Sequence, residues 1–292
     1  MFKKLDDGAI LSDLEGMGLT DTVVVKKDGT ALYITQDLAL TDIKKKKHNA
    51  TKMIWIIGPE QSLAMNQLFA ICEQLGVGKR NEFIHLAYGY MSIKGQGKMS
   101  SRKGNVMYLD DVLDEAKDRI KNVMKDRVSA DVLEKDSEII AHSAIALGIL
   151  KAGRMTDIAF DLDDALRLEG DTGPYLEYST VRAKSLVQKA HDEGFTDYSF
   201  VAKEGMEISA LEKHLYRYSE VVERAGNELS PSTIANYLIE LAGLFNGFYA
   251  QGQIIDSSDK ETTLYKVAIT DAFATTMTNG LKLLGISVPG KM

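Results

Sequence analysis

The chain has 292 residues, 45% of them hydrophobic and 26% charged, with a formal net charge of −7. This size favours two globular domains, and the negative charge argues against binding nucleic acid by bulk charge alone. No apolar run approaches the roughly 18 residues of a membrane span, and the N-terminus lacks the apolar core of a signal peptide. The single cysteine, Cys72, favours a cytoplasmic location. The histidines are scattered along the sequence, so we expect no metal site.

The first third of the chain has the pattern of an α/β fold. Apolar runs at 23–25 and 31–34 flank Asp28-Gly29, and this dipeptide between two such runs predicts a β-hairpin. Residues 53–57 form a continuous apolar run that ends at a Gly-Pro pair, which is typical of a buried parallel strand.

A helical pattern separates this run from the next one. Apolar residues recur at helical spacing over 64–75, and Gly76 stands where a helix C-cap belongs. Residues 83–90 then predict another strand. Strand, helix and strand in this order predict a parallel unit, whose ligands bind beyond the carboxyl ends of the strands.

From Leu109 almost to the C-terminus the pattern is helical. Apolar stripes at helical spacing cover residues 109–123, 208–225, 234–248 and 269–284. Such stripes are typical of core faces rather than of cofactor sites, so the last ~120 residues predict a separate helical bundle. A boundary at the glycine-containing segment that starts at Gly170 gives domains of 1–169 and 170–292.

A basic segment follows the second predicted strand. Residues 98–105 read Lys-Met-Ser-Ser-Arg-Lys-Gly-Asn. Lysine and arginine supply charge and donors for polyphosphate, and Gly97 and Gly104 allow the backbone to approach an anion closely. For an arbitrary segment of this composition, a solvated basic turn is the alternative interpretation.

The order of residues in 98–105 resembles the KMSKS loop of class I aminoacyl-tRNA synthetases, which grips the ATP phosphates. Two further segments resemble arginyl-tRNA synthetases: 170–178 followed by Arg182, and the chain end at 280–292. Residues 164–167 also spell Asp-Ala-Leu-Arg, the tetrapeptide after which the helical domain of this family is named. The resemblance covers essentially the whole chain.

This resemblance implies an α/β region followed by an all-α region. The first is the C-terminal half of a Rossmann-type catalytic domain with connecting helices, and the second is a helical anticodon-binding bundle. The implied activity is that of an arginine–tRNA ligase, with L-arginine, tRNA(Arg) and ATP with Mg2+ as substrates. We expect no tightly bound cofactor, no membrane association and a monomer.

The phosphate loop follows from the same resemblance. The implied catalytic residues are Lys98, Ser100, Ser101 and Arg102, and the ATP-binding segment adds Met99 and Lys103. The loop would close over ATP with Lys98 nearest the pyrophosphate, where it acts by positioning and charge stabilisation. Arg102 replaces the final lysine of the common motif, which keeps the charge but changes the geometry of the donors.

Tyr33 and Asp37 place an aromatic ring and a carboxylate four residues apart at a predicted strand–helix junction. A carboxylate binds a guanidinium through two parallel hydrogen bonds, and the resemblance assigns Tyr33, Asp37 and Gln61 to the arginine pocket. Taken alone, Tyr33 is a strand core residue and Asp37 an acid at a helix start. The family usually has a histidine where this chain has Ala64.

The tRNA-binding surface is also implied by the resemblance. It comprises Tyr175, Tyr178, Asn246, Tyr249 and Met292. Aromatic and amide side chains read RNA bases by stacking and by hydrogen bonds. Phe248 fits the apolar stripe and is better placed in the core. The lysine run 44–47 is typical of a solvated helix face, with contact to a phosphate backbone as the alternative.

One motif of the family is absent. Class I synthetases need a HIGH motif near the start of the nucleotide-binding fold, and no such sequence occurs in this chain. The chain therefore resembles a C-terminal half, and truncation or a split gene would each account for the missing N-terminal half. The alternatives are a stand-alone tRNA-binding fragment without catalytic activity and another nucleotidyl-transferring enzyme. Residues 170–178 and the chain end argue against the latter.

Overall fold

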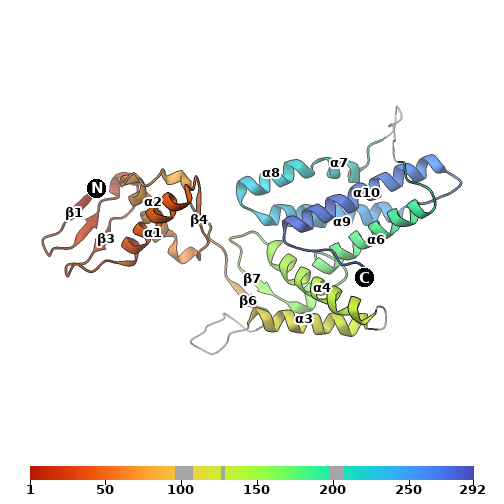
Figure 1. Ribbon diagram of the computed structural model, residues 1–292, viewed down its shortest axis with the longest axis horizontal. Coiled ribbons are helices and arrows are strands. Elements are labelled where there is room, and N and C mark those ends of the chain that lie inside the picture. The colour runs from red at the N-terminus through yellow and green to blue at the C-terminus, as the bar shows by residue number, and fades with distance from the viewer. Residues whose placement is uncertain (96–107, 126–128, 198–206) are drawn as a thin grey trace. The chain divides into compact units, whose positions relative to one another are not determined.

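The computed structural model describes residues 1–95, 108–125, 129–197 and 207–292. These residues fall into two compact units, 1–90 and 91–292 (Figure 1). The first unit combines short strands with two long helices, and the second is mainly helical. Within the described ranges, no helix is both long and apolar enough to cross a membrane.

The first unit begins with a three-stranded antiparallel sheet. Its strands, in spatial order, are β1 (Phe2–Lys4), β2 (Ile10–Ser12) and β3 (Thr22–Val25), and η1 (Glu15–Met17) lies between β2 and β3. Strands β1 and β2 were not predicted, because strands of three residues carry too short an apolar pattern, and the buried residue of β2 is the polar Ser12.

The predicted hairpin forms only at its turn. The Lys26 amide donates to the Thr30 carbonyl at 3.0 Å, and a single bridge pairs Val25 with Ala31. The prediction of a second strand at 31–34 is otherwise wrong, because helix α1 (Tyr33–His48) begins within it. The start of this helix takes the strand's place, since the Thr35 hydroxyl donates to the Val24 carbonyl.

The predicted parallel unit is present. Strand β4 (Met53–Trp55) pairs in parallel with β5 (Phe83–His85), and α2 (Ser62–Gln74) lies between them in the chain. The short 3-10 helices η2 (Pro59–Gln61) and η3 (Arg80–Glu82) flank α2. Gly76 follows α2 with a φ of +72°, as its expected place at the helix C-cap requires.

The predicted buried strand at 53–57 is shorter, as β4 covers only Met53–Trp55, and this apolar run is only partly buried. The rings of Trp55, Phe69 and Phe83 pack together with centroids 5.0–6.0 Å apart in the core of the first unit. Ile54 and Ile56 are instead 46% and 68% exposed. Successive side chains of a strand point to opposite faces, so one face of β4 packs inward and the other is open.

The second unit begins with a pair of parallel strands and two long helices. Strand β6 (Met91–Ile93) pairs with β7 (Ile158–Phe160), and α3 (Leu109–Met124) packs on α4 (Ala130–Leu150). The short helix α5 (Leu162–Ala165) follows. Neither strand was predicted. The helix stripe at 109–123 is confirmed as α3, whose buried residues include Val112, Ala116 and Ile120.

Among the described residues, five further helices belong to this unit: α6 (Gly173–Asp192), α7 (Ala210–Tyr216), α8 (Tyr218–Glu228), α9 (Pro231–Ala250) and α10 (Lys260–Leu283). The stripes at 234–248 and 269–284 run along α9 and α10. The stripe at 208–225 spans two helices, α7 and α8, which are separated at Arg217. Its first residue, Ile208, was wrongly placed on a core face, because it lies before α7 and is 62% exposed.

The core of the second unit lies between α6, α9 and α10, which pack on one another (Figure 1). Phe245 and Phe273 stack at its centre with ring centroids 3.9 Å apart. Leu147 of α4 belongs to the same buried cluster, so a connecting helix and the bundle share one core. The predicted domain boundary at Gly170 stays a prediction.

Candidate functional site

An arginine lies between two tyrosine rings where α6 packs on α9. The Cζ atom of Arg182 is 4.4 Å from the ring centroid of Tyr178 and 4.9 Å from that of Tyr249, and the guanidinium donates to the Tyr178 hydroxyl. Tyr178 and Arg182 are one turn apart on α6, so they share a helix face. Cation–π attraction holds the guanidinium between the two rings.

Arg182 was missed as a site residue, although the sequence contained its signal. It stands four residues after Tyr178, a spacing that brings two side chains of a helix into contact. Only the packing of α9 on α6 adds Tyr249 to the pair. The result is a cationic, aromatic cluster, and such side chains can stack on splayed bases.

Asn246 is held by two neighbours on α6. Its Nδ2 donates to the Tyr175 hydroxyl at 2.8 Å and to Ser179 Oγ at 3.0 Å. The two predicted residues Asn246 and Tyr175 are thus hydrogen-bonded to each other, and the Asn246 amide positions the tyrosine ring. Phe248, by contrast, packs against the helical core, in agreement with its place in the apolar stripe.

Tyr178 and Met292 line a common cavity of about 300 Å³. The other lining residues are Arg119, Ile120, Val123, Met124, Ile140, Asp163, Leu166, Arg167, Leu168 and Pro174. Most of these walls are apolar, and Arg119 donates to Asp163 among them. A cavity with apolar walls, a tyrosine and arginine donors suits a flat ring with polar edges.

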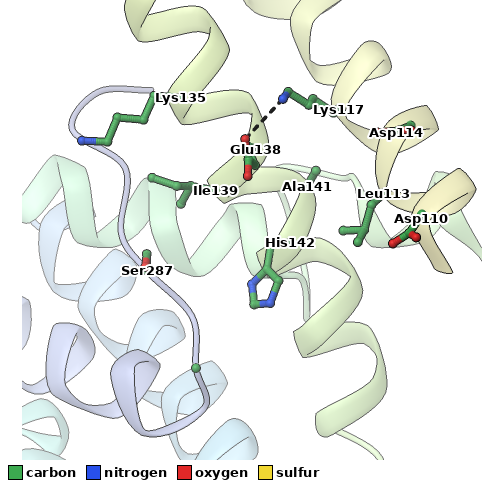
Figure 2. A pocket seen from close by; sticks show the side chains of 11 residues that line it. Asp110, Leu113, Asp114, Lys117, Lys135, Glu138, Ile139, Ala141, His142 and Ser287 are labelled. Atoms are coloured by element: carbon green, nitrogen blue, oxygen red, sulfur yellow. Dashed lines mark hydrogen bonds and ion pairs between the residues drawn. The ribbon is translucent and has the colours of Figure 1, made fainter.

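A second cavity, of about 780 Å³, is lined by residues of α3, α4 and the C-terminal segment (Figure 2). Its walls carry both signs of charge: Lys117 pairs with Glu138 at 3.3 Å, and Lys135 and His142 lie on α4 (Figure 2). Within the described ranges, no three or more His, Cys, Asp and Glu side chains are grouped to hold a metal ion.

Two of the residues assigned to the arginine pocket lie on α1. Tyr33 is the first residue of this helix and is 85% exposed, and Asp37 is partly exposed one turn later. The alternative interpretation of Tyr33 as a strand core residue is therefore wrong. Gln61 ends η2 and is exposed, as is Ala64 on α2. Tyr33 and Asp37 share one face of α1 through their spacing.

The predicted phosphate loop lies outside the described residues. This applies to Lys98, Met99, Ser100, Ser101, Arg102 and Lys103. The described chain ends shortly after β6 and resumes at Tyr108, just before α3. The assignment of these residues to ATP stays a prediction.

Comparison with known proteins identifies both parts of the chain. Residues 1–162 match a family model described as tRNA synthetases class I (R), catalytic domain, and residues 176–292 match the DALR anticodon binding domain. The chain belongs to the arginyl-tRNA synthetase family. It represents the C-terminal half of such a synthetase, with a fragment of the class I catalytic domain followed by the helical DALR domain. The resemblance seen in the sequence is thereby confirmed.

Curated relatives agree with this assignment. The arginine–tRNA ligase of Lactobacillus delbrueckii subsp. bulgaricus is 35% identical over 98% of this chain and 50% of the relative. That of Halothermothrix orenii is 34% identical over the same shares of the two chains. The chain thus spans about half the length of the curated relatives it matches.

Solved structures of the family have the same fold. Thermus thermophilus arginyl-tRNA synthetase superposes with a TM-score of 0.83 at 24% identity, over 98% of this chain and 54% of the other. The arginyl-tRNA synthetase of Plasmodium falciparum gives 0.79 at 19% identity, over 100% of this chain and 50% of the other. At these identities the likeness shows the fold alone.

Proposed function

We propose that this chain supplies the phosphate loop, part of the arginine pocket and the anticodon-reading surface of an arginine–tRNA ligase. The observation that carries the proposal is the order of the two matched regions, a class I (R) catalytic segment followed by a DALR domain in one continuous chain. The first region belongs to amino-acid activation and the second to tRNA recognition.

In the activation step, the arginine carboxylate attacks the α-phosphorus of MgATP, and pyrophosphate leaves as arginyl-adenylate forms. Lys98, with Ser100, Ser101 and Arg102, would meet the charge that develops on the phosphates. Asp37 would hold the substrate guanidinium by paired hydrogen bonds, next to the ring of Tyr33. Transfer of the arginyl group to tRNA(Arg) would follow.

The second unit would hold the tRNA. The rings of Tyr178 and Tyr249, fixed around Arg182, provide stacking faces for unpaired bases. The neighbouring cavity that contains Met292 offers space for one ring. Since the net charge is −7, local contacts such as these, rather than bulk attraction, would carry the binding.

The first unit supports a requirement for the family's N-terminal half. Parallel sheets normally have both faces covered, yet β4 and β5 form a two-stranded sheet with Ile54 and Ile56 exposed. Tyr33 and Leu63 add further exposed apolar surface in this unit, at 85% and 54%. We propose that the family's N-terminal half, with its HIGH motif, covers this surface and completes the site.

A stand-alone tRNA-binding fragment is the second candidate function. The well-packed core of the second unit favours it. In that case the chain would bind tRNA(Arg) and would never activate arginine, whichever polypeptide is added.

Arginine-dependent ATP–pyrophosphate exchange tests the two candidates. The 292-residue chain would be assayed alone and with the separately expressed N-terminal half of a bacterial arginine–tRNA ligase. We expect no exchange by the chain alone and robust exchange by the mixture, with Lys98→Ala greatly reducing the rate. Robust exchange by the 292 residues alone would contradict the need for the N-terminal half. Binding of tRNA without exchange in the mixture would support the second candidate.

A further inference from the structure

A carboxyl group is buried without a hydrogen-bond partner where α6 packs on α4. The side chain of Glu177 is fully buried, and within the described part of the chain neither of its oxygens has a donor. The two helices approach closely here. A Cβ atom on Gly173, one turn before Glu177, would lie 2.3 Å from the backbone of Ser143 on α4. The missing side chain of Gly173 therefore allows α4 to enclose Glu177.

The hydroxyl groups near Glu177 direct their protons elsewhere. Ser143 donates to the Ile140 carbonyl at 2.9 Å, and Thr180 donates to the Leu176 carbonyl at 2.7 Å. Burial raises the pKa of the Glu177 carboxyl well above its ordinary value. The nearby Ser143 hydroxyl lowers this pKa in part, and the negative charge of Asp136 raises it further. A protonated Glu177 is neutral and brings its own donor, which a hydroxyl oxygen can accept.

Asp136 connects this site to the C-terminus. It lies on α4 two turns before Ser143 and is only 4% exposed. Its Oδ2 accepts a hydrogen bond from the Lys291 backbone amide at 3.3 Å. The next residue, Met292, packs against the core of α3 and α4 and lines the 300 Å³ cavity. Asp136 is thus the buried group that holds the chain end beside this cavity.

The same C-terminal segment also borders the larger cavity. Gly285 and Ser287 line it, together with Lys135 and His142 of α4 (Figure 2). Residues 285–292 therefore contribute to both cavities, and any movement of this segment would change the two together.

We propose that Glu177 and Asp136 form a proton-dependent latch for the C-terminal segment. With a proton on Glu177, the pair carries a single charge and Asp136 holds the Lys291 amide. When Glu177 releases its proton to solvent, two negative charges share a site closed to water. The helices are fixed by their core, and Ile286 and Val288 of the C-terminal segment pack in the same core. The residues beyond them, which include Lys291 and Met292, therefore move and let water reach the carboxylates.

Other charged groups on the neighbouring elements are exposed or have partners of their own. On α4, Lys135 and His142 are exposed and line the larger cavity, and Glu138 pairs with Lys117. The Lys291 side chain is exposed, and Arg182 on α6 lies between Tyr178 and Tyr249. Helices α9 and α10 meet α6 through apolar residues such as Leu238, Phe273 and Met277, and through the neutral amide of Asn246. Within the described ranges, Asp136 is the charged group that acts on Glu177.

Asp136 is accordingly a positioning residue for Met292. It would act on tRNA through the docking of the chain end rather than by touching RNA. This consequence rests on the proposed function, but the latch itself can be observed without RNA. Its readout is the environment of the Met292 methyl group as the pH changes.

Methyl NMR of the full chain labelled with [13C-methyl]methionine tests the latch. Met292→Leu assigns the Met292 signal, and Met277, fully buried in the bundle core, reports the fold. As the pH rises above about 4.3, the ordinary pKa of glutamate, and on through the raised pKa of Glu177, we expect the wild-type Met292 signal to move toward that of a disordered methionine while Met277 stays unchanged. In Glu177→Gln, which keeps the shape but loses the titrating proton, the Met292 signal should keep its low-pH position.

Two further variants sharpen the test. Asp136→Ala should release Met292 at every pH, because the acceptor of the Lys291 amide is gone. Glu223→Gln makes the same chemical change on the exposed face of α8 and should retain the wild-type transition. A Met292 signal independent of pH in the wild type, or a full transition in Glu177→Gln, would overturn the latch. Movement of Met277 together with Met292 would also overturn it, because it would show general unfolding.

Discussion

The two units of this chain differ in how completely they bury their apolar side chains. In the second unit, Phe245, Phe273 and Leu238 are fully buried in a core formed by helices close in sequence. In the first unit, Ile54 and Ile56 remain exposed beside the packed rings of Trp55 and its neighbours. A helix bundle closes its core with consecutive helices, whereas a parallel sheet depends on strands from distant parts of the fold.

The largest expected effect concerns the first unit and follows from its proposed role in binding arginine. In the chain combined with its N-terminal half, Asp37→Asn should weaken arginine binding by about 2–4 kcal/mol, the scale for a charged donor left without its partner. The affinity for ATP should change little. Titration calorimetry with each substrate measures both. Equal losses for arginine and ATP would instead indicate damage to the fold.

The next effect tests how tightly the second unit is packed. Gly173→Ala places a Cβ atom 2.3 Å from the Ser143 backbone, and the forced shift of α6 from α4 should cost about 2–3 kcal/mol. Denaturant unfolding measures this loss. Gly226→Ala on α8 is the matched control, because its Cβ atom would meet nothing within 4 Å and alanine favours a helix by up to about 1 kcal/mol. Equal stability of the two variants would contradict the tight crossing of the helices.

The stability of the second unit should also depend on pH through Glu177. Its folded-state pKa is raised, so its contribution is complete below the unfolded-state pKa, about 4.3 for glutamate. As the pH rises from there through the folded-state pKa, the free energy of unfolding should fall by up to about 1.4 kcal/mol per pH unit. Glu177→Gln should flatten this part of the curve, which denaturant unfolding at a series of pH values measures. An unchanged slope in the variant would contradict a buried, protonated Glu177.

A smaller effect is expected at the aromatic cluster. Tyr249→Ala removes one ring beside Arg182 and should weaken binding of tRNA(Arg) by about 1–2 kcal/mol, the scale of one base stacked on an aromatic ring. Tyr216→Ala is the control, since this tyrosine is 90% exposed at the end of α7. Fluorescence titrations with normal and anticodon-substituted tRNA would separate base recognition from phosphate binding. Equal affinity for both tRNAs would contradict the assignment of the surface.

The smallest effect is expected on the open face of the first unit. Ile56→Ser should change the stability of the chain alone by less than about 0.5 kcal/mol, because this side chain is 68% exposed. The same substitution should weaken association with the N-terminal half, where the side chain would be covered. Thermal unfolding and a binding titration measure the two quantities. A large loss of stability without the partner would show that the face is already covered within this chain.

The sequence by itself determined the family and the local elements. Apolar stripes predicted α3, α9 and α10, and the order of apolar runs predicted the parallel pair β4 and β5 with α2 between them. These features depend on residues a few positions apart, so local periodicity reveals them. The motifs that identify the family are equally local.

Only the tertiary structure decided which distant residues meet. The pairing of β6 with β7, the place of Arg182 between rings from two helices, and the burial of Glu177 against α4 all join segments far apart in the chain. Tyr33 also shows that local patterns are insufficient. Its apolar neighbours suggested a strand, whereas contacts with β3 set the start of a helix at this residue. Short-range patterns indicate which face of an element is apolar, but the partner of that face is chosen by the packing of the whole unit.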